Sequence, residues 1–458
     1  MGQLAQAGTG RKKMKENHVY SMELDREYPL IERGDGVYVY TTDGTQIIDG
    51  ASGPVAVGLG HGIKEIAGAI GAQAEKLAFA HRDDCLTPEL IESCRRIYEF
   101  SDRDMYKTFQ VCSGSEATET AIKLVRKYNI ARGKKDKYKI IARWQSYHGI
   151  TMGALSLSGF GSRKKGYESY AFEQGHIAPC YCYRCWFGQK PESCGLQCAK
   201  ALENEILAQG PDSVAAFIAE PVSGMSLCAA VPHPEYFKEI RRICDAYDVV
   251  LILDEVMTGF GRTGKSFAYK HFGIVPDVIT TGKSMSGGYF PLAGVSITKA
   301  FYDVMKEHNV FFPPGHTWSG SPLGAAAHIA ADTYMKEHDC IANCRKMGAY
   351  LKQEMEKLSQ RHPAMDDVRG LGLMVGAEFV KDPQTKESFN ISEGVAGRIQ
   401  MACLERNMLI EASQGCNRGA AGDAIVISPA FVVTEEQIDE IIVRLDAAIT
   451  QVEKELGY

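Results

Sequence analysis

Asp248-Val-Val-Leu-Ile-Leu-Asp-Glu-Val256 places five consecutive apolar residues directly before Asp254 and Glu255. Such a run, rich in β-branched side chains, is typical of a strand buried on both faces, as in a parallel sheet covered by helices. A second short run, Val278-Ile-Thr-Thr281, ends at Gly282 and Lys283. Open α/β sheets bind their ligands at the carboxyl ends of strands. The two runs therefore predict an acid and a lysine at such an edge.

An acid and a lysine in these positions suit pyridoxal phosphate. A lysine amine forms a Schiff base with a carbonyl. Pyridoxal phosphate needs this amine and also an acid that keeps its ring nitrogen protonated, so that the ring can accept electrons. We therefore assign Lys283 as the amine and Asp254 as the acid. A surface lysine and a solvated acidic pair remain the alternative on these two runs alone.

The longer sequence around these residues resembles one enzyme family. Two motifs carry the resemblance, Asp254-Glu-Val-Met-Thr-Gly-Phe-Gly-Arg-Thr-Gly264 and Thr281-Gly-Lys-Ser284. They closely resemble the class III (omega) aminotransferases, a group of fold-type-I pyridoxal phosphate enzymes, and the resemblance extends over the chain from about Tyr20 onward. It implies that Lys283 is the Schiff-base lysine and that Asp254 is the partner of the pyridinium nitrogen.

A candidate phosphate site lies earlier in the chain. Phe109-Gln-Val-Cys-Ser-Gly-Ser-Glu116 predicts a strand that turns into a helix over 116–132. Backbone N–H groups at a helix N-terminus, with serine hydroxyls beside them, make an anion site. Ser113, Gly114 and Ser115 are therefore candidates to hold the cofactor phosphate. Serine is also an ordinary helix N-cap, but this segment matches the phosphate loop of the family.

The resemblance implies further residues around the cofactor ring. Val256 would pack on one face of the ring, and Tyr147 would stack on the opposite face, with His148 next to it. The pair Tyr147 and His148 follows a predicted buried strand over 138–142. Glu220 ends another apolar run and would lie beside the active site, able to pair with an arginine or a substrate amine.

One segment interrupts the strand–helix pattern. Residues 311–320 contain prolines and glycines and precede an alanine-rich helix over 323–335. In the family the corresponding loop reaches the neighbouring subunit, and the match of Thr317 binds that subunit's cofactor phosphate. The resemblance thus implies a homodimer with shared active sites.

Two departures from the family concern the substrate. Many relatives have a glutamine at the position of Met257, where it donates to the phenolic oxygen of the cofactor. A thioether cannot donate, which points away from the ornithine and 4-aminobutyrate branches. Amine-specific relatives often have bulky aromatics at the substrate entrance, where this chain has Pro54 and Val55.

The residue that binds the acceptor carboxylate is left open by the sequence. Many relatives have an arginine before a stretch that matches Gly422–Pro429, but Glu411 stands in the usual arginine place. An insertion over 413–421 carries Arg418, which could bind a carboxylate through two parallel hydrogen bonds or be a solvated loop arginine. Weaker candidates are Arg82 and Arg163.

The order of the patterns predicts the fold class. Strands and helices alternate from about 104 to 300, which predicts a doubly wound, mostly parallel sheet. With the resemblance, this gives an α/β fold-type-I pyridoxal phosphate transferase. We expect a large cofactor-binding domain over 66–335. A smaller α+β domain would be built from both chain ends, the N-terminal segment 1–65, with a hairpin over 37–49, and the C-terminal part 336–458.

Composition excludes several classes of protein. The chain has 458 residues, a net charge of −6 and 45% hydrophobic residues, which suits a globular protein with a large core. The acidity argues against nucleic-acid binding, because the Arg11–Lys15 run is short and expected to be solvated. No apolar run approaches the roughly 18 residues of a membrane span, and the first residues lack the apolar core of a signal peptide. We therefore expect a cytoplasmic protein.

Fourteen cysteines in a long chain of this kind favour reduced thiols over disulfides. A Cys-x2-Cys pair and a Cys-x3-Cys pair could together hold zinc; they are formed by Cys182, Cys185, Cys194 and Cys198. The group lies outside every catalytic motif and its intervening segment is short, so plain loop cysteines are favoured and the metal is left open.

These observations predict a pyridoxal phosphate-dependent aminotransferase that moves an amino group from a primary amine or ω-amino acid to a 2-oxo acid. A racemase, epimerase or aminomutase on the same fold is the nearer alternative, because it would use the same lysine and aspartate without net consumption of 2-oxo acid. A non-catalytic binding protein is the farther one, and the intact Lys283, Asp254 and phosphate loop argue against it.

Overall fold

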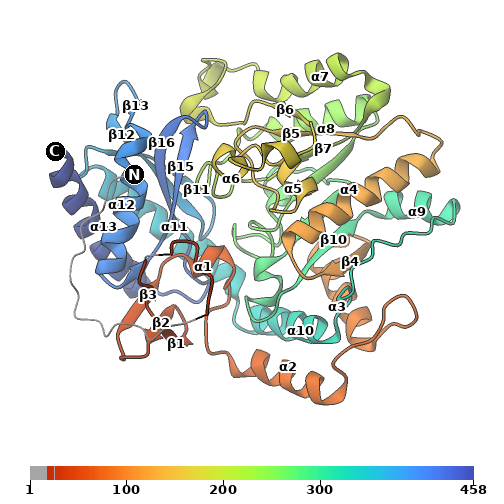
Figure 1. Cartoon of the computed structure of the whole chain (residues 1–458), viewed down its shortest axis with the longest axis horizontal. Coiled ribbons are helices and arrows are strands. Elements are labelled where there is room, and N and C mark those ends of the chain that lie inside the picture. Colours follow the sequence, from red (N-terminus) through yellow and green to blue (C-terminus); the bar gives the residue numbers. More distant parts are fainter. Residues whose placement is uncertain (1–17, 25) are drawn as a thin grey trace.

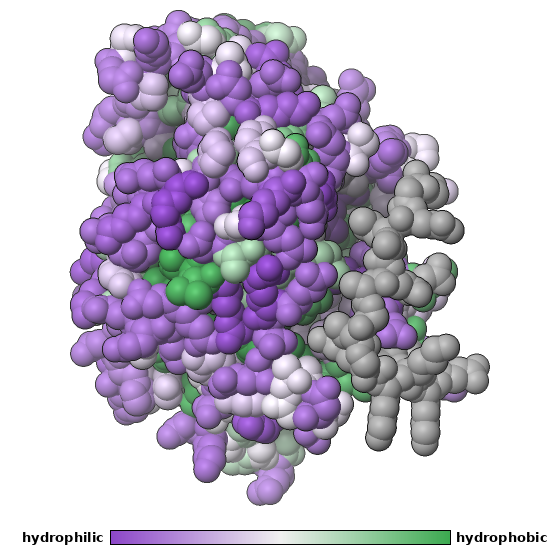
Figure 2. Space-filling model, turned by 90° about the vertical axis from the view of Figure 1, so that its left-hand side faces the viewer, coloured by the Kyte–Doolittle hydropathy of each residue, from purple (hydrophilic) through white to green (hydrophobic). Residues whose placement is uncertain are grey.

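A computed structural model describes residues 18–24 and 26–458, and the Arg11–Lys15 run lies outside them. The described chain has a larger part around one wide sheet and a smaller part that contains the C-terminal end (Figure 1). Within the described residues no helix is long and apolar enough to cross a membrane. The face of the smaller part is mostly hydrophilic, with one small apolar group near its centre (Figure 2).

The larger part is built on a seven-stranded sheet. Its strands, in spatial order, are β4 (Lys107–Val111), β10 (Ala293–Ile297), β9 (Val278–Thr281), β8 (Val250–Asp254), β7 (Val214–Ala219), β5 (Lys139–Arg143) and β6 (Gly175–Ile177). The strands from β9 to β6 are parallel, and β10 is antiparallel to both of its neighbours. The predicted mostly parallel sheet is therefore confirmed.

Helices cover both faces of this sheet, as the alternation of side chains along β8 demonstrates. Val250 and Ile252 pack into a cluster with α4 (Gly114–Ala131) and α9 (Lys299–Glu307). Leu251 and Leu253 point the other way, because successive side chains of a strand alternate between faces, and they join the main core. All five residues of β8 are buried, as predicted for a strand covered on both sides.

The remaining helices of the larger part complete the two layers. The main-core face is covered by α2 (Lys64–Lys76), α3 (Pro88–Phe100), α7 (Gln197–Gln209), α8 (Tyr236–Ala246) and α10 (Pro322–Glu337). The chain also has three short helices, α1 (Ser52–Val55), α5 (Met152–Leu157) and α6 (Gly161–Lys164). The helices predicted over 116–132 and 323–335 correspond to α4 and α10.

The smaller part contains two sheets. The first is antiparallel and consists of β11 (Met365–Gly370), β12 (Val375–Asp382), β13 (Glu387–Ser388), β15 (Glu411–Asn417) and β16 (Ala421–Ile427). It is accompanied by α11 (Cys340–Ser359), α12 (Val395–Glu405) and α13 (Glu435–Leu456).

The second sheet joins the two ends of the chain. Its strands are β1 (Ile31–Asp35), β2 (Tyr38–Thr41), β3 (Gln46–Asp49) and β14 (Met408–Leu409). The predicted hairpin over 37–49 is β2 paired antiparallel with β3, and β14 adds to β3 in parallel. A smaller part made from both chain ends is thus confirmed, whereas the domain limits at 65 and 335 stay predictions.

Candidate active site

The candidate site lies along one edge of the large sheet. Strands β8 and β9 are parallel neighbours, and Asp254 is paired in register with Thr280. Asp254 ends β8, and Lys283 follows the end of β9 by two residues. The carboxyl ends of adjacent parallel strands lie side by side, so two side chains that are far apart in sequence are brought to the same edge.

Three donors hold the carboxylate of Asp254. The Nδ1 atom of His148 lies 2.7 Å from Oδ2. The hydroxyl of Thr280 donates to Oδ1 over 3.0 Å, and the backbone N–H of Val256 donates to the same oxygen over 3.1 Å. Since both His148 and Asp254 are buried, this network fixes the direction in which the carboxylate points.

Lys283 begins a short 3-10 helix, η6 (Lys283–Ser286), with a backbone φ of +47°. A positive φ is unfavourable for a residue with a side chain, and such strain is concentrated at functional sites. Burial lowers the pKa of Lys283 to about 8, and the carboxylates of Asp254, Glu411 and Glu220 oppose that shift. A substantial fraction of the amine is therefore neutral near physiological pH and able to act as a nucleophile or base.

The N-terminus of α4 is the place where the sequence predicts an anion site. Ser113 caps the helix by accepting from the N–H of Glu116 over 3.3 Å. Ser115 accepts from the N–H of Ile150 over 3.0 Å, which ties this turn to the segment after His148. A Cβ atom added to Gly114 would lie 2.9 Å from Cγ1 of Val256, so only glycine lets the phosphate loop approach Val256 this closely.

Glu220 extends the same edge. It follows β7 directly, and its Oε1 accepts from the N–H of Gly224 over 2.9 Å. Burial raises the pKa of Glu220, and His148 and Arg143 partly oppose this. A Cβ added to Gly224 would lie 2.8 Å from Sδ of Met257, so Met257 packs beside this segment.

The side chains at this edge fit pyridoxal phosphate. In the described part of the chain, three buried polar atoms around it lack a hydrogen-bond partner: His148 Nε2, Glu220 Oε2 and Ser284 Oγ. Buried polar groups normally have partners, so the site has unsatisfied capacity for a polar ligand. Among the described residues the amine of Lys283 has no hydrogen-bond or ion-pair partner. This amine, the fixed carboxylate of Asp254 and the N-terminus of the 18-residue α4 are of the kinds that would meet the aldehyde, ring nitrogen and phosphate of the cofactor.

The structure separates the three candidate arginines. Arg163, on α6, acts electrostatically on both Tyr147 and Glu411. Arg82 lies over the ring of Phe109 at 3.7 Å. Arg418 is exposed at the turn between β15 and β16 and lies 5.6 Å from the ring of Trp186. Only Arg163 of the three thus has an interaction with other candidate site residues in the described structure.

The N-terminal loop also reaches this edge. A Cβ on Gly58 would lie 2.5 Å from Oγ of Ser284, the residue after Lys283. Val55 in the same loop is fully buried and has a positive φ of 59°. A β-branched residue seldom adopts such a backbone. The assignment of Val55 to the substrate entrance stays a prediction.

Thr317 lies on an exposed segment between α9 and α10. The neighbouring side chain of Trp318 is 55% exposed, and Phe311 at the start of the segment is 78% exposed. His316 Nε2 lies 3.0 Å from the hydroxyl of Thr120 on α4, which anchors the segment beside this helix. Large apolar side chains exposed together are typical of a surface that another chain covers.

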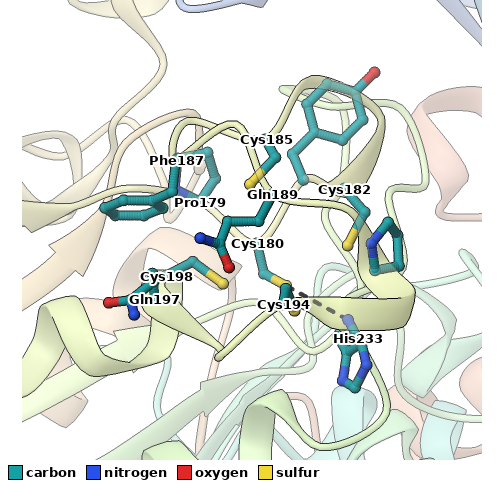
Figure 3. A pocket seen from close by; sticks show the side chains of 12 residues that line it. Pro179, Cys180, Cys182, Cys185, Phe187, Gln189, Cys194, Gln197, Cys198 and His233 are labelled. Carbon is teal, nitrogen blue, oxygen red and sulfur yellow. Dashed lines mark hydrogen bonds between the residues drawn. The ribbon is translucent and has the colours of Figure 1, made fainter.

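The cysteine segment lies away from this site. Figure 3 shows Cys182, Cys185, Cys194 and Cys198 around a small cavity, with Cys180 held by the N–H of His233 at 3.4 Å. All fourteen cysteines are free. Among the residues that are described, no group of three or more potential ligands is arranged to hold a metal ion, so zinc remains an unsupported alternative.

Sequence reasoning missed the role of two side chains. Arg262, inside the first family motif, is fully buried and donates to three backbone carbonyls of the smaller part. Nothing in the sequence separates it from a solvated arginine. Glu411 was noticed only as the absence of an arginine, yet its carboxylate acts on Lys283 more strongly than that of Glu220 does.

The chain is similar to known proteins over most of its length. The family described as aminotransferase class-III matches residues 20–449. A diaminobutyrate–2-oxoglutarate transaminase from Halomonas elongata is 36% identical over 92% of this chain and 90% of that protein. A taurine–pyruvate aminotransferase from Bilophila wadsworthia is 34% identical over 96% of each. The crystal structure of a transaminase from the marine bacterium Virgibacillus superposes with a TM-score of 0.90, at 30% identity, over 96% of this chain and 98% of that one.

Proposed function

The chain belongs to the class III aminotransferases, and we propose that it moves the amino group of a primary amine or ω-amino acid to a 2-oxo acid. The observation that carries this proposal is the placement of Lys283 beside the hydrogen-bonded carboxylate of Asp254, at the edge where α4 begins. Enzymes of this family use pyridoxal phosphate.

The residues at the sheet edge have distinct tasks in this proposal. Bound pyridoxal phosphate supplies an aldehyde for amines and a ring that accepts an electron pair. The N–H groups of Ser113, Gly114 and Ser115 would bind its phosphate. Asp254, held by His148, would supply the negative charge that keeps its ring nitrogen protonated.

Lys283 is the proposed acceptor and donor of the proton that leaves the amine-bearing carbon of the substrate. With a pKa of about 8, its Nζ is basic enough to accept a proton from the amine-bearing carbon of the substrate and acidic enough to return it. Val256 and Tyr147 would pack on opposite faces of the cofactor ring and so restrict its position. Glu220 lies at the same edge. Its Oε2 has no hydrogen-bond partner in the described structure and is therefore available to a polar ligand.

For the acceptor, we propose Arg163 as the carboxylate-binding residue. Its guanidinium has no ion pair within the described residues, and its field reaches Tyr147. A guanidinium binds a carboxylate through two parallel bonds. Arg82 lies over the ring of Phe109 and Arg418 over that of Trp186, and neither aromatic residue is a candidate site residue, which makes these two arginines weaker candidates.

We also propose a cytoplasmic homodimer with shared active sites. Exposed Phe311 and Trp318 flank Thr317 and provide an apolar surface for a second copy. The free state of all fourteen cysteines suits a reducing compartment.

The half-reaction is the direct test of function. Purified protein loaded with pyridoxal phosphate is mixed with a panel of amines, and the change in cofactor absorbance is followed; a 2-oxo acid is then added. We expect one 2-oxo acid to be consumed for each amine converted, and no conversion by Lys283→Ala. Racemisation or amine migration without consumption of 2-oxo acid would contradict the proposal and favour the alternative enzymes on this fold.

A further inference from the structure

Glu411 occupies an unusual place at the active-site edge. It is the first residue of β15, and its side chain shares a face of that strand with Ser413. Strand β15 is fastened to the segment before Tyr147, because the side-chain amide of Gln145 donates to the carbonyls of Gly415 (3.1 Å) and Cys416 (2.6 Å). These two hydrogen bonds fix the position of β15, and therefore of Glu411, relative to the active site.

The carboxylate of Glu411 faces charged groups without bonding to any of them. Burial raises the pKa of Glu411, while Lys283 and Arg163 lower it and Asp49 raises it further. Across the described chain, no side chain forms a hydrogen bond or an ion pair with this carboxylate. Asp254 and Glu220, at the same edge, both accept hydrogen bonds.

A partly buried carboxylate without a partner is unfavourable, because the lost hydration is not replaced. A cationic ligand that forms an ion pair with the carboxylate of Glu411 would replace that lost hydration. There is room beside it: a cavity of about 330 Å³ lies between α6 and β15, lined on one side by Arg163 and on the other by Ala412 and Ser413, which directly follow Glu411.

We propose that Glu411 binds a second, positively charged amine of the donor, so that the preferred donors are diamines. This inference rests on the proposed aminotransferase function and names its donor class. The distal amine of such a donor is protonated at neutral pH, as a lysine side chain is. A donor with an anionic tail, such as a sulfonate, would instead be repelled.

Family membership alone leaves this choice open. One similar protein is named for diaminobutyrate, whose side chain carries a second amine, and another for taurine, whose tail is a sulfonate. The sign of the charge that meets the tail must therefore come from residues of this chain. Glu411 and Asp49 supply a negative charge there, and Arg163 lies across from Glu411 for the carboxylate of the acceptor.

The test compares donors that differ in the charge of the tail. Wild-type holoenzyme is assayed with 1,4-diaminobutane, its mono-N-acetyl derivative, n-butylamine and taurine. We expect kcat/KM for the diamine to exceed that for each of the other donors by about 10- to 100-fold, the range for a hydrogen bond to a charged group.

Two variants locate the effect. Glu411→Gln keeps the shape and removes the charge, so the ratio of kcat/KM for the diamine to kcat/KM for n-butylamine should collapse to within about threefold. Glu405→Gln, an exposed carboxylate at the end of α12, is the matched control and should keep the wild-type preference.

Each outcome has a definite meaning. If wild type prefers n-butylamine or taurine, or if Glu411→Gln leaves the preference unchanged, the inference is wrong even though transamination occurs. An equal loss with all donors would assign Glu411 a structural role and also overturn it. If no amine is converted by wild type, the proposed function itself fails.

Discussion

Lys283 combines a positive φ with a depressed pKa, two features that lower stability. Burial is the main cause of the shift from 10.5 to about 8. Between these two values the unfolded chain holds a proton that the folded chain lacks, so stability rises with pH in that window. Below pH 8 the burial of this amine therefore opposes folding in full.

Replacing Lys283 should accordingly stabilise the protein without cofactor. We expect Lys283→Met to raise the free energy of unfolding by about 2–3 kcal/mol at pH 7. Urea denaturation of both cofactor-free proteins measures the difference, which should shrink as the pH is raised to 10 because wild type then loses its penalty. An equal difference at both pH values would show that packing, and not charge, is responsible.

The groups that donate hydrogen bonds to the carboxylate of Asp254 can also donate to the oxygen of an amide. Asp254→Asn keeps an oxygen for the hydroxyl of Thr280 and the N–H of Val256, so the fold should be retained. The negative charge is lost, and turnover should fall at least about 100-fold, as for other preorganised electrostatic groups. Stopped-flow absorbance measures the rate, and an unchanged circular dichroism spectrum is the control. A rate near that of wild type would mean that another residue meets the ring nitrogen.

At the scale of elements, Arg262 connects segments from three regions of the chain. Its guanidinium donates to the carbonyls of Leu373 (2.9 Å), Ser428 (3.2 Å) and Pro429 (2.6 Å). It also lies 3.5 Å from the hydroxyl of Ser52 in α1. Burial lowers the pKa of Arg262 to about 10, still high enough for it to remain charged at neutral pH. The first family motif thus also joins the large sheet to both ends of the chain.

Truncation of the Arg262 side chain should destabilise the protein, because the contacts between the large sheet and both ends of the chain are lost. We expect Arg262→Met to lower the free energy of unfolding by about 2–4 kcal/mol, because several buried carbonyls lose their donor. Arg345→Met is a suitable control, since Arg345 is exposed and donates only to the carbonyl of Gly264; its effect should stay within about 1 kcal/mol. Urea denaturation compares the two variants, and equal effects would contradict the special role of Arg262.

At the scale of the whole molecule, the exposed segment with Thr317 raises the question of which active site it serves. If Thr317 binds the phosphate of a neighbouring subunit, each site is made by two chains. Two inactive variants, Lys283→Ala and Thr317→Ala, can then complement each other. In a mixed dimer, the chain that keeps its lysine receives an intact Thr317 from its partner, so one site is fully wild type.

Mixing the two variants under conditions that exchange subunits should restore about one quarter of wild-type activity, because half of the dimers are mixed and each has one intact site. Lys283→Ala mixed with Asp254→Ala is the matched control: Asp254 and Lys283 lie at the same sheet edge of one chain, so no site is repaired. If the Thr317 mixture, shown to contain mixed dimers, stays inactive, Thr317 acts within its own chain.

The family, the cofactor and most of the helices and strands follow from the sequence alone. The apolar run over 249–253 predicts a strand because local periodicity and β-branched side chains limit the backbone, and the family motifs identify Lys283 and Asp254 as candidates. The helices α4, α10 and α13 likewise follow from local patterns and their N-caps.

The tertiary structure alone decided how distant segments meet at the site. The sequence does not show which of Arg163, Arg82 and Arg418 binds the acceptor carboxylate. Only the packing of α6 against β15 brings Arg163 near Glu411. Whether Glu411 is solvated or buried, and whether Arg262 is exposed or enclosed by carbonyls more than 100 residues away, depends on contacts between regions remote in sequence. Local patterns restrict the backbone of each segment, whereas burial and charge environment arise only when the segments pack together.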